Sequence, residues 1–197
     1  MSIVQIPDRS LNKKTWTLLN STGTSISLVG YTSLTISNLP IKKKLLIMLD
    51  GVSLGSSQGS GVVVRINGVG NANSEYTATG MVFTVSSQLL NGAGAGTLGG
   101  LYGGIRAFTF NAADSGTGSQ GGYIIIDDAD SVNGFKSFQT QGYTAQPGGA
   151  SGAEAFNIAG IYSGDTAPVT SLTIGTGHSY SQNYTFDSGS VLIYGSE

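Results

Sequence analysis

The segment Val62-Val63-Val64-Arg65-Ile66-Asn67 decides the fold class of this chain. Its even-numbered residues are all apolar, whereas its odd-numbered residues are mixed in polarity. A period of two is that of a β-strand with one face on a core and the other face nearer to water. The segment 135–139 shows the same parity and places Lys136 and Phe138 together on one side of the chain. Both segments therefore predict strands.

Strand character recurs along the whole chain. Besides 62–67, twelve segments are rich in Val, Ile, Thr, Phe and Tyr and are bounded by Gly, Ser, Asn or Asp: 15–19, 25–29, 33–37, 45–50, 77–85, 105–111, 123–127, 135–143, 155–162, 171–175, 180–186 and 190–194. No ten-residue stretch has a helical stripe, and at most a turn or two of helix is expected near 86–90. We predict an all-β fold, an antiparallel β-sandwich of jelly-roll type with about eight core strands.

Length and composition place these strands in one domain. With 197 residues, the chain suffices for one core, and we expect an extended N-terminal arm over 1–14 followed by a single domain over 15–197. Charged residues make up only 10% of the chain, against about 25% in a typical soluble domain. Gly is abundant, with 31 residues, and the net charge is −2.

This composition argues against several partners. A net charge of −2 gives no attraction to nucleic acid. The basic run Lys42-Lys43-Lys44 is interpreted as shielding the start or edge of a strand. The longest apolar run, 45–49, is too short to span a membrane, and 1–14 lacks the apolar centre of a signal peptide. We therefore expect a soluble chain without a cleaved signal, and neither nucleic acid nor membrane as a partner.

The residues that usually carry catalysis or bind metal are sparse. The chain has one histidine, His178, between two predicted strands, and no cysteine, so a zinc site of the usual kind is not expected. Two matches to G-x-G-x-x-G, at 94–99 and 116–121, lack the strand-then-helix context of a dinucleotide site. We therefore predict no cofactor.

Carboxylates offer two alternatives to a purely structural role. Asp127, Asp128 and Asp130 form the only local acidic group; we interpret it as a polar strand end, with calcium binding as the alternative. A glycosidase pair is conceivable among four other carboxylates, but nothing in the sequence selects two of them: Asp50, Glu75, Asp114 and Glu154. We expect no catalytic residues and no enzymatic activity.

Glycine-rich stretches and tyrosines supply the candidate contact residues. The stretches 91–104, 114–122 and 146–152 are low in complexity and predict surface loops. The first carries three apolar side chains and no charge, which favours an oligomer interface made by Leu98, Leu101 and Tyr102. Tyrosines in or near loops could stack on sugar rings, and three are candidate ligand contacts: Tyr143, Tyr162 and Tyr180.

The order of these segments resembles virion proteins of tailed bacteriophages. The resemblance covers about 15–195 and rests on loose β-patterns, among them an R-x-N-G turn at 65–68 and a final strand ending in I-Y-G at 193–195. Its other segments are Trp16-Thr17-Leu18-Leu19, Ser25-Ile26-Ser27-Leu28, 34–40, 45–51, Ala159-Gly160-Ile161-Tyr162 and 168–174.

The resemblance implies a structural role. Such proteins are similar to jelly-roll modules of tail fibres and capsid surfaces, commonly trimeric and without an active site. Because only the arm 1–14 accompanies the domain, we expect a capsid decoration or cement protein at the virion surface. Its expected partners are other virion proteins and, in a homotrimer, two further copies of the chain. A tail-fibre module that recognises a host surface glycan is the alternative.

Overall fold

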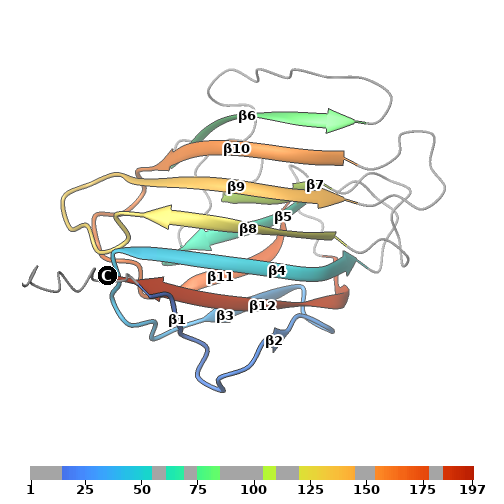
Figure 1. Ribbon diagram of the computed structural model, residues 1–197, viewed down its shortest axis with the longest axis horizontal. Coiled ribbons are helices and arrows are strands. Elements are labelled where there is room, and N and C mark those ends of the chain that lie inside the picture. The colour runs from blue at the N-terminus through green and yellow to red at the C-terminus, as the bar shows by residue number, and fades with distance from the viewer. Residues whose placement is uncertain are drawn as a thin grey trace, which may run out of the picture.

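The computed structural model describes residues 15–54, 61–68, 75–84, 104–109, 120–144, 154–177 and 184–197 (Figure 1). All regular structure in these ranges is β. The strands are β1 (Thr17–Leu18), β2 (Ile26–Ser27), β3 (Ser33–Ile36), β4 (Lys44–Leu54), β5 (Gly61–Ile66), β6 (Tyr76–Thr84), β7 (Ile105–Thr109), β8 (Gln120–Asp127), β9 (Lys136–Thr144), β10 (Glu154–Tyr162), β11 (Leu172–Gly177) and β12 (Phe186–Ser196).

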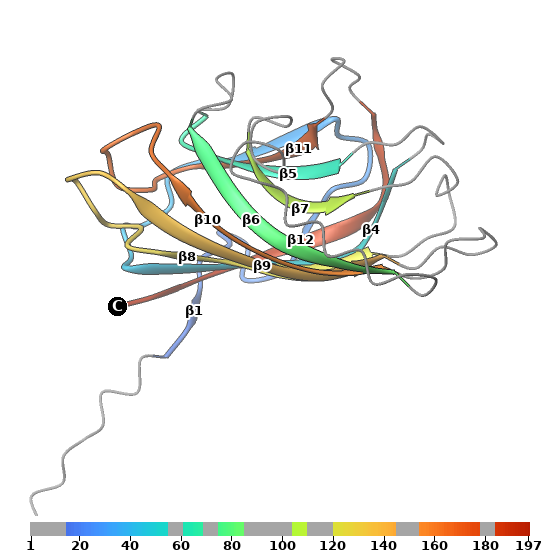
Figure 2. The same ribbon diagram turned by 90° about the horizontal axis from the view of Figure 1, so that it is seen from above.

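The strands form two antiparallel sheets packed face to face (Figure 2). The large sheet has the order β1-β12-β4-β8-β9-β10-β6, with β2 also paired to β12, and the small sheet has the order β3-β11-β5-β7. In Figure 2 the large sheet curves along one side and β5, β7 and β11 lie across its concave side. The predicted antiparallel β-sandwich is thus confirmed.

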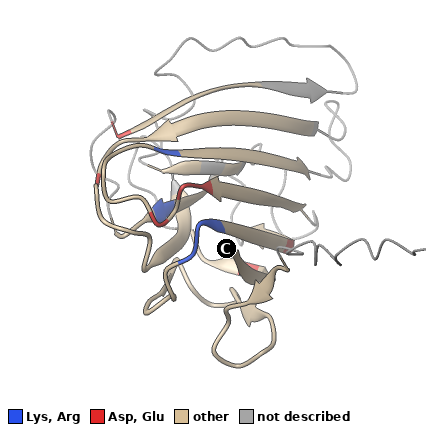
Figure 3. Ribbon diagram, turned by 60° about the vertical axis from the view of Figure 1, so that its left-hand side comes forward, with Lys and Arg blue, Asp and Glu red and all other residues tan. Residues whose placement is uncertain are grey.

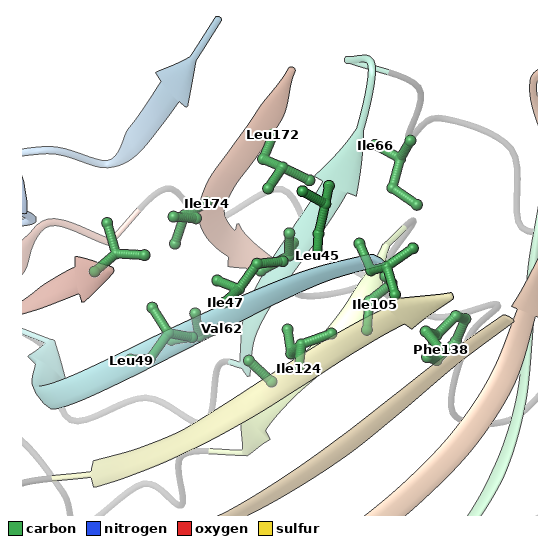
Figure 4. Close-up of a cluster of buried hydrophobic side chains, with 14 of the residues drawn as sticks. Leu45, Ile47, Leu49, Val62, Ile66, Ile105, Ile124, Phe138, Leu172 and Ile174 are labelled. Atoms are coloured by element: carbon green, nitrogen blue, oxygen red, sulfur yellow. The ribbon is translucent and has the colours of Figure 1, made fainter. Parts of the chain in front are cut away.

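The core lies between the two sheets and follows from the alternation of the strands. In β4, Leu45, Ile47 and Leu49 are buried, while Met48 between them is exposed. Ile124 of β8 and Ile174 of β11 are also fully buried, and Figure 4 shows such side chains converging from both sheets. Side chains with period two therefore close the sandwich by burying apolar area on one face of each sheet.

One end of the sandwich is closed by three connections that bond to each other. We call this the closed end and define it as residues 37–43, 128–135 and 163–171. Ala129 N–H donates to the carbonyl of Lys43 (2.8 Å), Val169 N–H donates to Ala129 (2.8 Å) and Leu39 N–H donates to Thr170 (2.9 Å). Backbone bonds between loops satisfy groups that strands would otherwise pair, so these connections are fixed relative to one another.

The structure corrects some details of the predicted pattern. Val63, which the alternation places on the face nearer to water, is fully buried, and Gly104 lies against its side chain. The predicted strand 180–186 is not found in its described part, 184–186, where only Phe186 is in a strand, as the first residue of β12. The predicted loop 114–122 ends early, since residues 120–122 belong to β8. The arm 1–14 and the helical turn near 86–90 lie outside the described residues.

Candidate binding surfaces

The closed end presents large apolar side chains to solvent. Phe135 is 69% exposed, Val132 60% and Ile41 55%. Trp16, 40% exposed, precedes β1, which pairs with the last residues of β12 beside the same end. Exposed side chains of this size on connections that are bonded together form a pre-shaped surface rather than scattered contacts.

Charges of both signs gather at the same end (Figure 3). Lys44 and Asp127 form an ion pair at 2.5 Å, and Lys42 pairs with Glu197. The basic run therefore flanks the start of β4, as its sequence position predicts. Each pair joins a more exposed side chain, Glu197 or Lys44, to a less exposed one, Lys42 or Asp127. Ion pairs at a surface contribute little stability, typically under about 1 kcal/mol, so their main effect is to make the closed end polar around its apolar residues.

A buried lysine supports the closed end from inside. Lys136 at the start of β9 is fully buried, and its Nζ donates to the carbonyls of Asp165 (3.2 Å) and Ser131 (3.4 Å). The same nitrogen lies 5.8 Å from the ring centre of Tyr162. Burial lowers the pKa of Lys136, and the nearby charge of Asp165 partly opposes this shift. The ammonium group thereby ties two of the three connections to the large sheet.

Two tyrosines, one on β10 and one on β6, extend this buried group of contacts beyond Lys136. Tyr162 and Tyr76 have ring centres 4.8 Å apart, and the Tyr76 hydroxyl accepts a hydrogen bond from Ile66 N–H (2.9 Å). That bond joins the large sheet to β5 of the small one. Burial raises the pKa of both tyrosines above the ordinary value of a phenol.

Asn67 forms hydrogen bonds to the third connection of the closed end, residues 163–171. Its φ of 51° lies in the left-handed region, where Asn is one of the few tolerated side chains. Its amide donates to Asp165 Oδ2 (3.1 Å) and to the Pro168 carbonyl (3.0 Å), and its oxygen accepts from the N–H groups of Thr170 and Ser171. The Ala167 N–H, followed by the Asn67 amide, lowers the pKa of Asp165.

A second surface lies on the outer face of the large sheet, towards its other end. It is a hollow of about 390 Å³, which we call the outer-face hollow, lined by Ser25, Met48, Leu49, Asp50, Gly121, Gly122, Tyr123, Tyr143, Ser190 and Leu192. Its volume falls within the range of roughly 300–1,000 Å³ that small-molecule sites occupy. Apolar and aromatic groups dominate the lining, and the carboxylate of Asp50 is its one charge.

Local irregularities of the strands produce the hollow. The register of β4 with β8 shifts between Leu49 and Val52, and Gly51 has a φ of 60°. Gly121 on β8 lies opposite Tyr143 on β9, and a Cβ on Gly121 would meet the Tyr143 hydroxyl at 2.9 Å. Bulges and strand glycines mark places where a sheet bends or lets another group approach closely.

The structure separates the three tyrosines predicted as ligand contacts. Tyr143 is 50% exposed and lines the hollow, as a ligand contact requires. Tyr162 is fully buried in β10, and this corrects the expectation that it contacts a ligand: the period of two along β10 turns its ring into the core. Tyr180 lies outside the described residues, as do Leu98, Leu101 and Tyr102 of the predicted oligomer interface.

The acidic residues are placed in different surroundings. Asp127 ends β8 in its ion pair with Lys44, and Asp128 follows in a turn with a φ of 55°. Asp50 and Glu75 lie near opposite ends of the large sheet, and Asp114 lies outside the described residues. No group of three or more His, Cys, Asp or Glu residues close enough to hold a metal ion occurs in the part of the chain that the structure describes.

Two further observations bear on function. Among the described residues, no helix has the length and apolar character needed to cross a membrane. No family model, curated protein or solved structure matches the chain.

Sequence reasoning found only parts of these surfaces. It selected Tyr143, but it did not bring Asp50 and Tyr123 to the same hollow, because strand pairing is not written in a local pattern. The available signal was the pair Gly121-Gly122 directly before an apolar run. In the structure both glycines lie inside β8.

Proposed function

We propose that this chain is a non-enzymatic structural protein of a bacteriophage particle and that it decorates or cements the capsid surface. The observation that carries the proposal is the closed end. Its three connections are bonded together, supported by the buried Lys136, and present Phe135, Val132 and Ile41 to solvent. A rigid surface of this kind loses little conformational entropy when it attaches to a partner.

The chemistry of the closed end suits a protein partner. Protein interfaces combine aromatic and apolar anchors at the centre with a polar rim. Phe135 and Val132 would be the anchors, and the ion-paired Lys42 and Lys44 would belong to the rim. Mixed charge also favours a partner with its own mixture of charges over a uniformly anionic one such as nucleic acid.

The strand order supports a jelly roll, the topology that the resemblance implies. Eight strands divide into β2-β12-β4-β8 in the large sheet and β3-β11-β5-β7 in the small one. Followed along the chain, these eight strands cross between the two sheets in the order expected of two nested Greek keys. On this interpretation, β6, β9 and β10 are an extension that widens the large sheet beyond β8.

We further propose that the attached form is a homotrimer, with Leu98, Leu101 and Tyr102 between subunits. The support is the uncharged, apolar character of the stretch 91–104. Multi-angle light scattering at micromolar concentration should give three times the 20.1 kDa chain mass. A monomer under these conditions would contradict the trimer but leave attachment through the closed end untouched.

Gold-labelled antibodies on intact particles from the source material test the main proposal. Regular labelling over the heads is expected. Particles that lack the protein should then rebind the purified chain, and Phe135→Ser should weaken rebinding at least tenfold, because a central aromatic anchor is lost. Tyr31→Ala, which removes a 47% exposed ring away from the closed end, is the matched control. If no particle carries the label, the proposal is overturned.

The outer-face hollow favours a second candidate, a receptor-binding module that recognises a host surface glycan. Tyr123 and Tyr143 supply aromatic rings, and Asp50 supplies hydrogen-bond acceptors in the same hollow. This candidate expects label on the tail or its fibres, and binding of the purified chain to host cells or to their extracted polysaccharide. Failure of both binding experiments would exclude it.

A further inference from the structure

We propose that the outer-face hollow binds one ring of a neutral sugar, with the ring stacked on Tyr143 and its hydroxyls bonded to Asp50. This inference rests on the second candidate function and names its site and its class of ligand.

Tyr143 provides a fixed aromatic platform. The residue opposite it, Gly121, has no side chain, so the ring lies down on the sheet, with its hydroxyl 2.9 Å and its Cε1 3.1 Å from where a Cβ would be. Half of the side chain nevertheless remains exposed. A ring held by the sheet and open to solvent stacks on an apolar ligand face without first losing rotamer freedom.

Tyr123 is held beside this platform. Its hydroxyl donates to Oε1 of Gln141 at 2.5 Å, which fixes its direction along the sheet. Met48 of β4 is its cross-strand neighbour and is 41% exposed. The floor next to Tyr143 is therefore apolar, and the C–H face of a pyranose ring is the part of a sugar that such a floor accepts.

The polar groups of the hollow select hydroxyl donors. Asp50 is exposed, and its carboxylate has no hydrogen-bond or ion-pair partner among the described residues. Ser25 and Ser190 lie nearby with hydroxyls that both donate and accept. A carboxylate accepts two hydrogen bonds side by side, which matches two neighbouring sugar hydroxyls.

Charge narrows the class of ligand further. The lining contains Asp50 and no Lys, Arg or His, so an acidic sugar would meet like charge with nothing to offset it. Neutral hexoses and their N-acetyl derivatives are therefore the expected ligands, rather than uronic or sialic acids.

Saturation-transfer NMR of the full chain with single sugars tests the site. The probes are glucose, galactose, mannose and N-acetylglucosamine, with glucuronic acid as the acidic comparison; at least one neutral sugar should bind and glucuronic acid should bind at least tenfold more weakly. Asp50→Asn keeps the shape and should lower affinity about tenfold. Tyr143→Phe keeps the ring and should bind within threefold of wild type, whereas Tyr143→Leu should lose binding.

Controls keep these results interpretable. Tyr31→Ala removes an exposed ring that is not part of the hollow and should bind as wild type does. Each variant must retain the far-ultraviolet circular dichroism of the wild type, and Asp50→Asn, an exposed isosteric change, remains decisive if Tyr143→Leu does not fold.

The outcomes separate the site from the function. Binding of a neutral sugar that is unchanged in both Asp50→Asn and Tyr143→Leu would overturn the assignment of the hollow but retain a glycan-binding function elsewhere on the chain. Binding of none of the probes, or stronger binding of glucuronic acid than of every neutral sugar, would overturn the proposed ligand class.

Discussion

Substituting Gly160 by alanine tests the packing of the extended part of the large sheet. Gly160 on β10 lies opposite Ala78 on β6 and Phe138 on β9. A Cβ at Gly160 would lie 2.9 Å from the Cβ of Ala78 and would overlap the Thr77 carbonyl oxygen and the ring of Phe138. The Thr77 carbonyl belongs to the backbone of a paired strand and the Phe138 ring is buried, so neither group can move aside freely.

Two opposing terms set the magnitude. Replacing glycine in a strand by alanine restricts the unfolded chain and stabilises the fold by about 0.5–1 kcal/mol. Overpacking of a well-filled core costs about 1–3 kcal/mol, and more where backbone must shift. Because the overlap involves backbone, the second term dominates, and Gly160→Ala should reduce the free energy of unfolding by about 2 kcal/mol.

Equilibrium unfolding in guanidinium chloride, followed by circular dichroism, measures this difference. At a slope of about 4 kcal/mol/M, the midpoint should fall by roughly 0.5 M. Gly175→Ala is the matched control, because its nearest neighbours, Ser33 and Arg65, would lie 3.4–3.5 Å from the new Cβ. That variant should be unchanged or more stable by up to about 1 kcal/mol. A Gly160→Ala protein as stable as Gly175→Ala would refute the register of β6, β10 and β9.

Substitutions at three further residues probe the support of the closed end by the same unfolding assay. Tyr76→Phe should cost about 1–3 kcal/mol, because the buried N–H of Ile66 loses its acceptor, and no loss would contradict the bridge between the sheets. Asn67→Ala should lower stability by about 1 kcal/mol more than Asn67→Gly, because both lose the side-chain bonds but only alanine is strained at positive φ. Burial lowers the pKa of Lys136, so in the pH range between the folded and unfolded pKa values the unfolded state keeps the proton that the folded state releases. The unfolding free energy of the wild type minus that of Lys136→Met should therefore rise from pH 7 towards pH 10. A difference that does not change with pH would mean that the ammonium group is not desolvated.

The strands could be predicted from the sequence because their signal is local. The alternation at 62–67 and 135–139 predicts β5 and β9 directly, and the latter even places Lys136 on the side of Phe138, where both are buried. Parity along one strand depends only on the geometry of an extended chain. It indicates which residues share a face, whatever the partner strands are.

The surfaces could not be predicted in this way, because they depend on which strands meet. Asp50 and Tyr143 are far apart in sequence and share a hollow only through the pairing of β4 with β8 and of β8 with β9. Tyr162 shows the converse error: the sequence places it at the end of the predicted strand 155–162, next to a loop, yet its ring is directed inward from the end of β10. Composition gives loop character on average, whereas burial is decided by the opposite sheet.

The positions of the two surfaces make attachment and sugar binding separable. Phe135 lies in the closed end, before the start of β9, and Tyr143 lies near the end of the same strand, so the extended strand itself holds the two sites apart. Phe135→Ser should therefore weaken rebinding to particles while sugar binding stays within twofold of wild type. Asp50→Asn should do the reverse, because it changes one charge at the far end of the large sheet and none of the loop contacts. If either variant impaired both activities without a loss of stability, the two surfaces would have to act as one, and the separation argued from the length of β9 would be wrong.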